Sequence, residues 1–450
     1  MWRPDSWRSK PVLAQQPAYP DPEALRLATD ELSSLPPLVT VLEVERLKSQ
    51  LAEAAAGQRF VLQGGDCAES FADCSTATIT NKLKILLQMS LVLVHGLETP
   101  IVRIGRIAGQ YAKPRSDDTE TRDGVTLPSY RGDLVNGVEF TAAARTPDPK
   151  RLLTGYSLSA LTLNYIRALT ESGFADLGHP ENWDLGFVQH SPLAGEYNDL
   201  VDELKRNLRF FELVAGGRPP ELKRVDFYTS HEALLLAFEQ AMTRRVEGRW
   251  YNLSTHFPWV GMRTAGLDSA HIEYARGIAN PLGLKVGPGL KTDDLLRLLD
   301  RLDPNHEPGR ITLIHRMGAS KIAQGLPPLI KAIQATGRTP LWIADPMHGN
   351  TASTSAGYKT RRYNDILSEL EQAFALHAEH GSRLGGVHFE LTGDDVTECT
   401  GGARGLKEAD LRRAYKSLVD PRLNYEQALE MALSIVACRR AGGRRSQAAG

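Results

Sequence analysis

The sequence predicts an α/β protein built as a (β/α)8 (TIM) barrel, with an N-terminal extension and a helical insertion between the second and third strands. Three observations predict this fold: short apolar runs recur along the chain, helix-like segments separate them, and one interval is far longer than the others. Short apolar runs alternating with helical segments are typical of parallel βα units, and eight such units suffice to close a barrel.

The N-terminal extension is predicted to cover residues 1–56. Residues 1–40 carry many prolines and little periodicity, which indicates an extended arm or a helix pair lying on the main body. Residues 41–56 repeat apolar side chains at helical spacing, including Val44 and Leu47, and Gly57 ends this helix. The catalytic barrel is therefore expected at residues 57–440.

Eight apolar runs are the predicted barrel strands. They are FVLQG at residue 60, PIVRIG at 100, VDFYTS at 225, WYNLST at 250, LKVGP at 284, ITLIHR at 311, PLWIAD at 340 and VHFELTG at 387. Helix-like segments follow several of them, among them residues 293–303 and 326–336. This alternation continues to the last strand, as a closed barrel requires.

About 120 residues separate the second run from the third, far more than one helix and two loops need. Residues 158–171 and 200–213 within this interval have amphipathic helical patterns. We therefore expect a helical insertion at about residues 150–220. The composition of residues 441–450, AGGRRSQAAG, predicts a disordered tail.

Composition limits the classes of function. The 450 residues are 42% hydrophobic and carry a formal net charge of −1, which gives no electrostatic reason to expect nucleic acid or a membrane as partner. No apolar run reaches the roughly eighteen residues of a membrane span, and the basic N-terminus precedes no apolar signal region, so a cytoplasmic protein is expected. The four cysteines are too sparse for a disulfide framework and remain available as thiols.

Residues with metal-binding chemistry follow the predicted strands, at the end of the barrel where active sites lie. They are Cys67 in QGGDC, His348 in DPMHGN, Glu390 in HFELTG and, further on, Asp420 in LVDPRLN. A mixed set of sulfur, nitrogen and oxygen ligands suits Mn²⁺, Co²⁺, Fe²⁺ or Zn²⁺ better than Mg²⁺ or Ca²⁺. Each residue also has a purely structural interpretation: Cys67 as a small buried hydrophobe, for example, or Asp420 as a turn residue.

Basic residues form a second set at the same predicted end. They are Arg106, Lys113, Arg115, Arg263, Lys285 and Arg316. Guanidinium groups match phosphate and carboxylate oxygens, so this face would bind a small molecule with several negative charges. Lys285 is hard to explain on a buried strand otherwise, whereas Arg115 could simply pair with Asp117 or Asp118. No nucleotide-binding fingerprint accompanies them.

Nine longer motifs then indicate a family. They are QGGDCAESF, RIGRIAGQYAKPRS, SYRGDLVNG, TSHEALLL, NPLGLKVGP, RMGASK, DPMHGNT, GGVHFELTGDDVTECTGGA and DPRLN. From about residue 30 to 438 the chain resembles the type II (plant-like) 3-deoxy-D-arabino-heptulosonate 7-phosphate (DAHP) synthases. The resemblance implies a metal-dependent (β/α)8 transferase that condenses phosphoenolpyruvate with D-erythrose 4-phosphate and releases phosphate, the first step of the shikimate pathway to aromatic amino acids.

The resemblance also implies roles for individual residues. The metal shell falls on Cys67, His348, Glu390 and Asp420, with Mn²⁺ or Co²⁺ expected first and Fe²⁺ or Zn²⁺ as alternatives. Phosphoenolpyruvate contacts fall on Arg106, the pair Met262 and Arg263, Lys285 and Arg316, and Lys113 lies beside both substrates. Met262 in WVGMRT departs from the family pattern, which has glutamate there. The change is mild if only the backbone N–H at this position meets the ligand, and harmful if the carboxylate orders water or Arg263.

For the chemistry, we expect Lys113 to protonate the developing alkoxide and Glu232, or a metal-bound carboxylate, to order the attacking water. Two rival functions are a synthase acting on another aldose phosphate, such as an amino-sugar phosphate, and a non-catalytic partner of chorismate mutase. By analogy with relatives, the insertion implies inhibition by tryptophan or another aromatic product, together with a homodimer or homotetramer. A chorismate mutase partner is also expected for the active enzyme.

Overall fold

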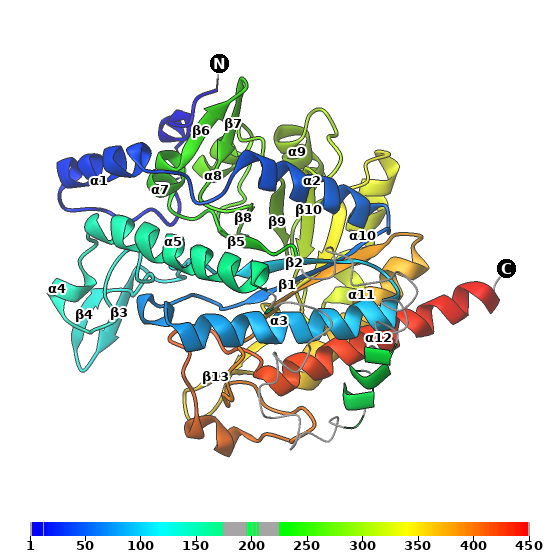
Figure 1. Ribbon diagram of the computed structural model, residues 1–450. Coiled ribbons are helices and arrows are strands. Elements are labelled where there is room, and N and C mark those ends of the chain that lie inside the picture. The colour runs from blue at the N-terminus through cyan, green and yellow to red at the C-terminus, as the bar shows by residue number, and fades with distance from the viewer. Residues whose placement is uncertain are drawn as a thin grey trace.

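Eight parallel strands close into a barrel in the computed structural model, which describes residues 2–11, 13–172, 174, 195, 197–199, 201–203, 205–206 and 225–448 (Figure 1). The barrel strands are β1 (Phe60–Gly65), β2 (Ile101–Arg106), β5 (Tyr228–Glu232), β8 (Phe257–Val260), β9 (Leu282–Val286), β10 (Ile311–His315), β11 (Leu341–Ala344) and β14 (Leu384–Glu390). Their order around the barrel is β1-β14-β11-β10-β9-β8-β5-β2, so the strands follow chain order and β14 closes on β1. The predicted (β/α)8 barrel is confirmed.

Helix α2 (Val41–Ala55) closes one end of the barrel. A capping box between Thr40 and Glu43 starts it, and its buried Leu47 and Leu51 belong to the same apolar cluster as Val61 and Ile343 from the barrel strands. The helix predicted at residues 41–56 is therefore confirmed. Because α2 lies against the first residues of β14, the opposite end of the barrel, where the strands finish, is left for ligands.

The outer helices surround the barrel. They are α3 (Thr76–Leu97), α7 (Leu236–Ala241), α8 (Ala270–Ala275), α9 (Thr292–Leu302), α10 (Ile322–Ala335), α11 (Tyr363–Glu379) and α12 (Tyr425–Ala448). Helices α9 and α10 correspond to the helix-like segments at 293–303 and 326–336. By length and composition alone α3 could cross a membrane, but 67% of its most apolar window is buried inside the protein, where it packs along α12.

The fourth barrel strand differs from the prediction. The run WYNLST at residue 250 lies in a separate hairpin of β6 (Thr243–Val246) and β7 (Arg249–Asn252), whose turn residues Glu247 and Gly248 have φ of 48° and 83°. The true strand is β8, FPWV. Proline cannot donate to a sheet and normally argues against a central strand, so Pro258 conceals β8 in the sequence.

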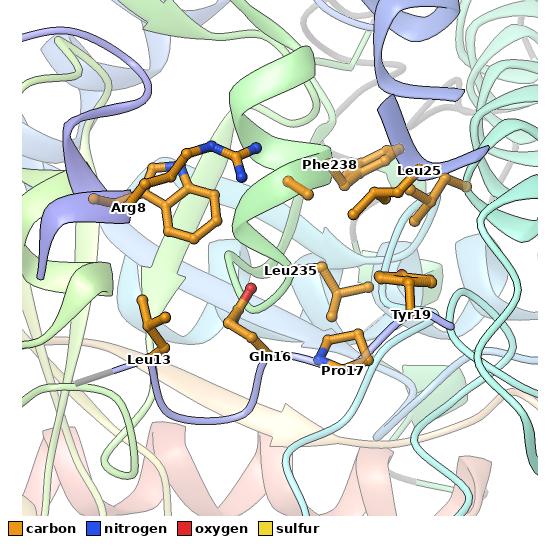
Figure 2. A pocket seen from close by; sticks show the side chains of 11 residues that line it. Arg8, Leu13, Gln16, Pro17, Tyr19, Leu25, Leu235 and Phe238 are labelled. Carbon is orange, nitrogen blue, oxygen red and sulfur yellow. The ribbon is translucent and has the colours of Figure 1, made fainter. Parts of the chain in front are cut away.

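The N-terminal extension begins with a short 3-10 helix η1 (Ser6–Ser9) and continues to helix α1 (Pro22–Ser34). The arm between them crosses α7 and closes a pocket of about 300 Å³ (Figure 2). Side chains of the arm such as Gln16 and Tyr19 face Leu235 and Phe238 across this pocket.

Between β2 and β5 the chain forms the hairpin of β3 (Thr119–Arg122) and β4 (Val125–Pro128), then helices α4 (Ala142–Arg145) and α5 (Lys150–Glu171). Helix α5 contains the predicted helix 158–171, whereas the one predicted at 200–213 lies largely outside the described residues.

Other short elements lie in the loops that follow barrel strands. They are the hairpin of β12 (Thr351–Ser353) and β13 (Lys359–Arg361) and the 3-10 helix η6 (Glu408–Arg413); a further 3-10 helix, η2 (Phe71–Asp73), follows β1. The predicted disordered tail from residue 441 differs from the structure, in which α12 continues to Ala448. Alanine, arginine and glutamine in this segment favour a helix and offset its two glycines.

Candidate active site

The register of the barrel brings three side chains of the candidate site together. Gly65, at the end of β1, pairs with Arg106 of β2 on one side and with Glu390 of β14 on the other. Cys67 follows Gly65 by two residues, so a thiol, a guanidinium and a carboxylate meet where these three strands end. A Cβ on Gly65 would lie 2.5 Å from the carbonyl oxygen of Arg106, which explains why glycine stands there.

All four predicted metal ligands converge at this point. One ligand atom each from Cys67, Glu390 and Asp420 lies within 4.8 Å of the other two, and Cys67 Sγ is 3.8 Å from Asp420 Oδ2. His348 Nε2 lies 3.0 Å from Glu390 Oε1, while its Nδ1 lies 2.7 Å from Asp345 Oδ2. With Nδ1–H donating to Asp345, the imidazole presents Nε2 to the site, an arrangement common among metal-binding histidines.

The surroundings of these atoms fit a divalent cation. Both oxygens of Glu390 are buried and have no hydrogen-bond partner of good geometry among the described residues, although Arg361 Nη1 lies 2.7 Å from Oε2. The ammonium of Lys113 contacts Cys67 Sγ and lies 2.5 Å from Asp420 Oδ2, so these acceptors already attract a positive charge. A thiol, an imidazole and two carboxylates form a donor set suited to a borderline divalent ion.

Burial governs the protonation of this cluster. Burial, followed by the nearby Glu390 carboxylate, raises the pKa of the Cys67 thiol to about 12, against the lowering effect of Lys113 and Arg106. Burial disfavours the charged form of Lys113, but Cys67, Asp420 and Glu390 outweigh it and raise the pKa of the ammonium. A thiolate at Cys67 therefore needs a strong positive charge at hand, as a bound metal ion provides.

Arg106 is held by a directed chain of hydrogen bonds. Its Nη2 donates to the carbonyl of Cys67 at 2.9 Å, and its Nη1 lies 2.7 Å from His388 Nε2. Since a guanidinium can only donate, His388 Nε2 accepts and Nδ1–H donates to Gln63 Oε1 at 2.8 Å. Burial agrees with this neutral imidazole, because it lowers the pKa of His388 well below its usual value. The guanidinium also stacks over Trp259, 5.2 Å from the ring centre.

Lys285 and Arg316 both contact the loop that carries His348. The Lys285 ammonium pairs with Asp345, and Arg316 Nη2 donates to the carbonyl of His348. Burial lowers the pKa of Lys285 to about 8, although the Asp345 carboxylate opposes this shift. The candidate anion-binding residues and the candidate metal ligands are therefore parts of one connected network.

Arg263 and Arg115 lie farther out at the mouth. Arg263 Nη2 donates to Ser116 Oγ at 3.0 Å, which connects the loop after β8 to the loop after β2. Arg115 pairs with Glu120 at 3.3 Å and not with Asp117 or Asp118. The alternative partners that the sequence offered for Arg115 were therefore wrong, because the turn into β3 brings Glu120 back towards it.

Met262 contacts Arg316 through its sulfur. Its Sδ lies 2.9 Å from Arg316 Nη1, and the side chain is 38% exposed. It covers Gly287, where a Cβ would lie 2.2 Å from Met262 Sδ, and it lines a pocket of about 400 Å³ together with Lys285. The departure from glutamate thus places a neutral thioether beside Arg316, and Arg263 keeps its separate contact with Ser116.

Sequence reasoning missed two residues that orient the predicted site: Asp345, three residues before His348, and His388, two residues before Glu390. Alternate residues of a strand share a face, so His388 beside Glu390 could have been found from the pattern HFE.

The acids of QGGDCAES fix the loops around the site. The Glu69 carboxylate accepts backbone N–H groups from residues 108, 109 and 110 at 2.9–3.1 Å, in the loop that leads to Lys113. Asp66 pairs with Lys82 and, at 2.6 Å, with Arg422, two residues after Asp420. These acids therefore hold the loops that carry Lys113 and Asp420 against the one that carries Cys67.

Replacing Asp345 with asparagine is expected to weaken metal binding by about 10- to 100-fold, the usual cost of removing a group that orients a metal-binding histidine. The asparagine side chain is uncharged, so it accepts a weaker hydrogen bond from His348 Nδ1–H, and Lys285 loses its counter-ion. Calorimetric titration of the chelator-treated protein with Co²⁺ measures the affinity directly. Equal affinity in the two proteins would contradict the orienting role of Asp345.

The fold and the site together define a (β/α)8 enzyme in which a candidate divalent-metal centre adjoins a binding site for multiply charged anions. Residues 2–436 match the model of the class-II DAHP synthetase family, and the chain belongs to that family.

Three curated relatives cover almost the whole chain. A Neurospora crassa protein named phospho-2-dehydro-3-deoxyheptonate aldolase is 50% identical over an alignment of 452 positions that covers 96% of this chain and 93% of that protein. A Streptomyces coelicolor protein of the same name is 50% identical over 433 residues, 96% of either chain. A Mycolicibacterium smegmatis protein named phospho-2-dehydro-3-deoxyheptonate aldolase AroG is 44% identical over 440 residues, covering 96% and 94%.

Proposed function

We propose that this chain condenses phosphoenolpyruvate with D-erythrose 4-phosphate and water to give DAHP and inorganic phosphate, the first step of the shikimate pathway. Membership of the class-II DAHP synthetase family supports this activity. The structural observation that carries it is the contact between a metal donor set and a group of cations at one barrel mouth. Both substrates are phosphorylated anions, so several cations are needed to hold their reacting carbons close.

The cationic residues bind different groups of the two substrates. Arg106, Lys285, Arg316 and Arg263 hold the phosphate and carboxylate of phosphoenolpyruvate, with Met262 beside Arg316. Lys113 lies next to Cys67 and Asp420, where it can reach both substrates, and Arg115 lies two residues beyond it. Fixed guanidinium groups need little rearrangement as charge moves in the reaction, which favours the transition state over the free substrates.

Cys67, His348, Glu390 and Asp420 would hold the metal ion, with Mn²⁺ or Co²⁺ preferred and Fe²⁺ or Zn²⁺ as alternatives. When bound, such an ion supplies Lewis-acid polarisation of the aldehyde carbonyl without a change of oxidation state.

The chain's own residues complete the reaction. As C3 of phosphoenolpyruvate bonds to C1 of the aldehyde, Lys113 donates a proton to the former carbonyl oxygen. Water then adds to the cationic C2 and loses a proton to solvent. The C–O bond to phosphate breaks as the new C2 hydroxyl gives up its proton and becomes the ketone of the product. Glu232 is suited to position that water, because one of its carboxylate oxygens is buried without a hydrogen-bond partner and burial raises its pKa.

An acceptor panel distinguishes this function from its rivals. Purified protein with Mn²⁺ and phosphoenolpyruvate is expected to release phosphate with erythrose 4-phosphate and to react poorly with amino-sugar phosphates. A preference for an amino-sugar phosphate would favour the rival synthase. No phosphate release with any aldehyde would favour a non-catalytic partner of chorismate mutase.

The pKa of Lys285 predicts a pH dependence for phosphoenolpyruvate capture. Only the ammonium attracts the anion, so kcat/KM for phosphoenolpyruvate is expected to fall as the pH rises above about 8. The pKa of Lys285 in the folded chain lies below its value in the unfolded chain. At a pH between these two values the unfolded chain therefore binds more protons, so the contribution of Lys285 to the free energy of unfolding rises with pH in that range. The profile of kcat/KM against pH, measured at saturating erythrose 4-phosphate, checks the expectation.

Lys285→Arg is the comparison for that profile, because a guanidinium stays charged throughout this pH range. Its kcat/KM will be lower, but the alkaline decline is expected to disappear. An unchanged decline in this variant would show that another group titrates.

We further propose a cytoplasmic homodimer or homotetramer that also binds chorismate mutase and is inhibited by tryptophan or another aromatic product. Light scattering of the purified protein, with and without chorismate mutase, measures the assembly. Initial rates with each aromatic amino acid identify the effector.

A further inference from the structure

Two loops at the barrel mouth carry residues of the proposed site. The loop after β10, residues 316–321, begins with Arg316, and the loop after β11, residues 345–350, contains His348. We call them the β10 loop and the β11 loop. Each carries a side chain that has to be placed accurately, one for an anion and one for a metal ion.

The two loops meet backbone to backbone. A Cβ on Gly349 would lie 2.3 Å from the backbone nitrogen of Gly318, and one on Gly318 would lie 2.9 Å from the carbonyl oxygen of Gly349. Gly318 also has a φ of +88°, which glycine adopts without strain. Contacts this close leave no room for side chains at Gly318 and Gly349. Side chains from another element are therefore needed to bond the two loops to each other.

That element is α11, through Glu369. One carboxylate oxygen, Oε1, accepts the backbone N–H of Met317 in the β10 loop at 2.8 Å. The other, Oε2, accepts from the side-chain Nδ2 of Asn350 in the β11 loop at 2.7 Å. Asn350 returns to the β10 loop, where its Oδ1 accepts the N–H of Ala319 at 3.0 Å. One carboxylate therefore bonds to both loops.

A neighbouring side chain on the same helix face reinforces this contact. Gln372, three residues after Glu369, donates from Nε2 to the carbonyl of Ala319 at 3.0 Å. Residues three apart on a helix lie on one face, so α11 presents both side chains to the β10 loop.

The ionised carboxylate is costly for folding. Glu369 is fully buried, and no cation contacts it among the described residues. Burial raises its pKa to about 7, against the lowering effect of the N–H groups of Gly318 and Met317. A neutral glutamine or an apolar side chain would be buried at lower cost, so packing does not explain a carboxylate at this position. Two donors that need acceptors explain it.

We propose that Glu369 is a positioning residue that holds the β10 loop against the β11 loop and thereby places Arg316 for the anion and His348 for the metal ion. The roles of Arg316 and His348 rest on the proposed function. The contacts of Glu369 with the two loops do not.

Glu369→Gln is the test variant, because glutamine keeps the shape and replaces one acceptor by a donor. If the side-chain oxygen of the new glutamine accepts from the N–H of Met317, its NH₂ group faces the NH₂ group of Asn350. The Asn350 amide cannot rotate by 180° to avoid this clash, because its oxygen would then lose the bond from the N–H of Ala319. We expect Co²⁺ affinity, measured by calorimetric titration, to fall roughly tenfold and KM for phosphoenolpyruvate to rise by a similar factor. Glu371→Gln, an exposed site on the same helix, should change neither value.

A second substitution separates positioning from general destabilisation. In Glu369→Gln/Asn350→Asp the donor and acceptor exchange sides, so the amide of residue 369 can donate to the carboxylate of residue 350. That carboxylate still accepts from Ala319 but no longer donates to the carbonyl of Pro346, which lies 2.8 Å from Asn350 Nδ2. Asn350→Asp alone loses the same bond to Pro346 and also opposes two carboxylates, so the double variant is expected to bind Co²⁺ more tightly than Asn350→Asp. A double variant that binds Co²⁺ no more tightly than Asn350→Asp would overturn the proposal.

Other outcomes are equally decisive. If Glu369→Gln lowers only the melting temperature and leaves Co²⁺ affinity and KM unchanged, the residue is merely structural. If Glu369→Gln does not fold, Asn350→Ala removes the bond from Glu369 to the β11 loop together with the bonds of Asn350 to Ala319 and Pro346, and an unchanged Co²⁺ affinity there would overturn the proposal. Should the wild type show no turnover, the proposed function fails, but Co²⁺ titration still decides the role of Glu369.

Discussion

Replacing Cys67 with serine is expected to abolish measurable metal binding at the barrel mouth and, with it, turnover. Serine is not ionised at neutral pH, and it removes the soft donor from the set formed with Glu390, Asp420 and His348. The loss should exceed the about 100-fold that removal of a group supporting a metal ligand can cost. Titration with Co²⁺ followed by absorption measures it, because a thiolate ligand gives the complex a charge-transfer band that serine cannot.

Cys74→Ser is the matched control for Cys67→Ser. Cys74 Sγ contacts the carbonyl of Leu158 at 3.7 Å and accepts from Thr162 Oγ1 at 3.4 Å, and neither partner belongs to the candidate site. This variant should bind Co²⁺ with the wild-type absorption band. If Cys67→Ser kept the band and the control lost it, the thiolate ligand would have been assigned to the wrong residue.

Replacing Arg106 with methionine is expected to lower kcat/KM for phosphoenolpyruvate by at least about 100- to 1,000-fold, the usual cost of removing one preorganised donor. Arg106 is only 3% exposed and touches both Glu390 and the carbonyl of Cys67, so the substitution also disturbs the metal donors. Arg106→Lys should recover only part of the rate, because an ammonium keeps the charge but cannot reproduce the planar fork. Steady-state kinetics for both substrates provide the measurement.

Arg103→Met is the control for this prediction. Arg103 lies on the same strand and is also buried, but it bonds to Ser90 of α3 outside the barrel. Its loss should lower the melting temperature and leave the Michaelis constant for phosphoenolpyruvate unchanged. Equal loss of kcat/KM in the two variants would indicate that any buried arginine on β2 matters only for folding.

Most of the barrel could be predicted because its strands are short apolar runs between helices. The one strand that escaped, β8, contains Pro258, and a nearby hairpin offered a more strand-like run. The local preferences of residues 249–252 are satisfied in that hairpin, so the sequence pattern was correct about extended structure and wrong about its place. Only closure of the barrel, a long-range property, decides which run becomes the fourth strand.

The candidate site was predictable where chemistry follows a strand end, as with Cys67, His348 and Glu390. Residues that only hold or orient the site residues could not be predicted from the sequence, because their roles depend on contacts between distant segments. Asp66 and Arg422, for instance, are 356 positions apart and form an ion pair. The contact of Met262 with Arg316 belongs to this group as well, since it joins residues 54 positions apart, and Gly287 leaves room for the methionine sulfur.

The central claim is that this barrel is a metal-dependent enzyme that joins phosphoenolpyruvate to erythrose 4-phosphate. The most direct measurement is phosphate release by chelator-stripped protein before and after Mn²⁺ is restored, with and without erythrose 4-phosphate. We expect no release from the stripped protein, and release after restoration only when both substrates are present. Full release without metal, or none after restoration with Mn²⁺ or Co²⁺, would contradict the claim.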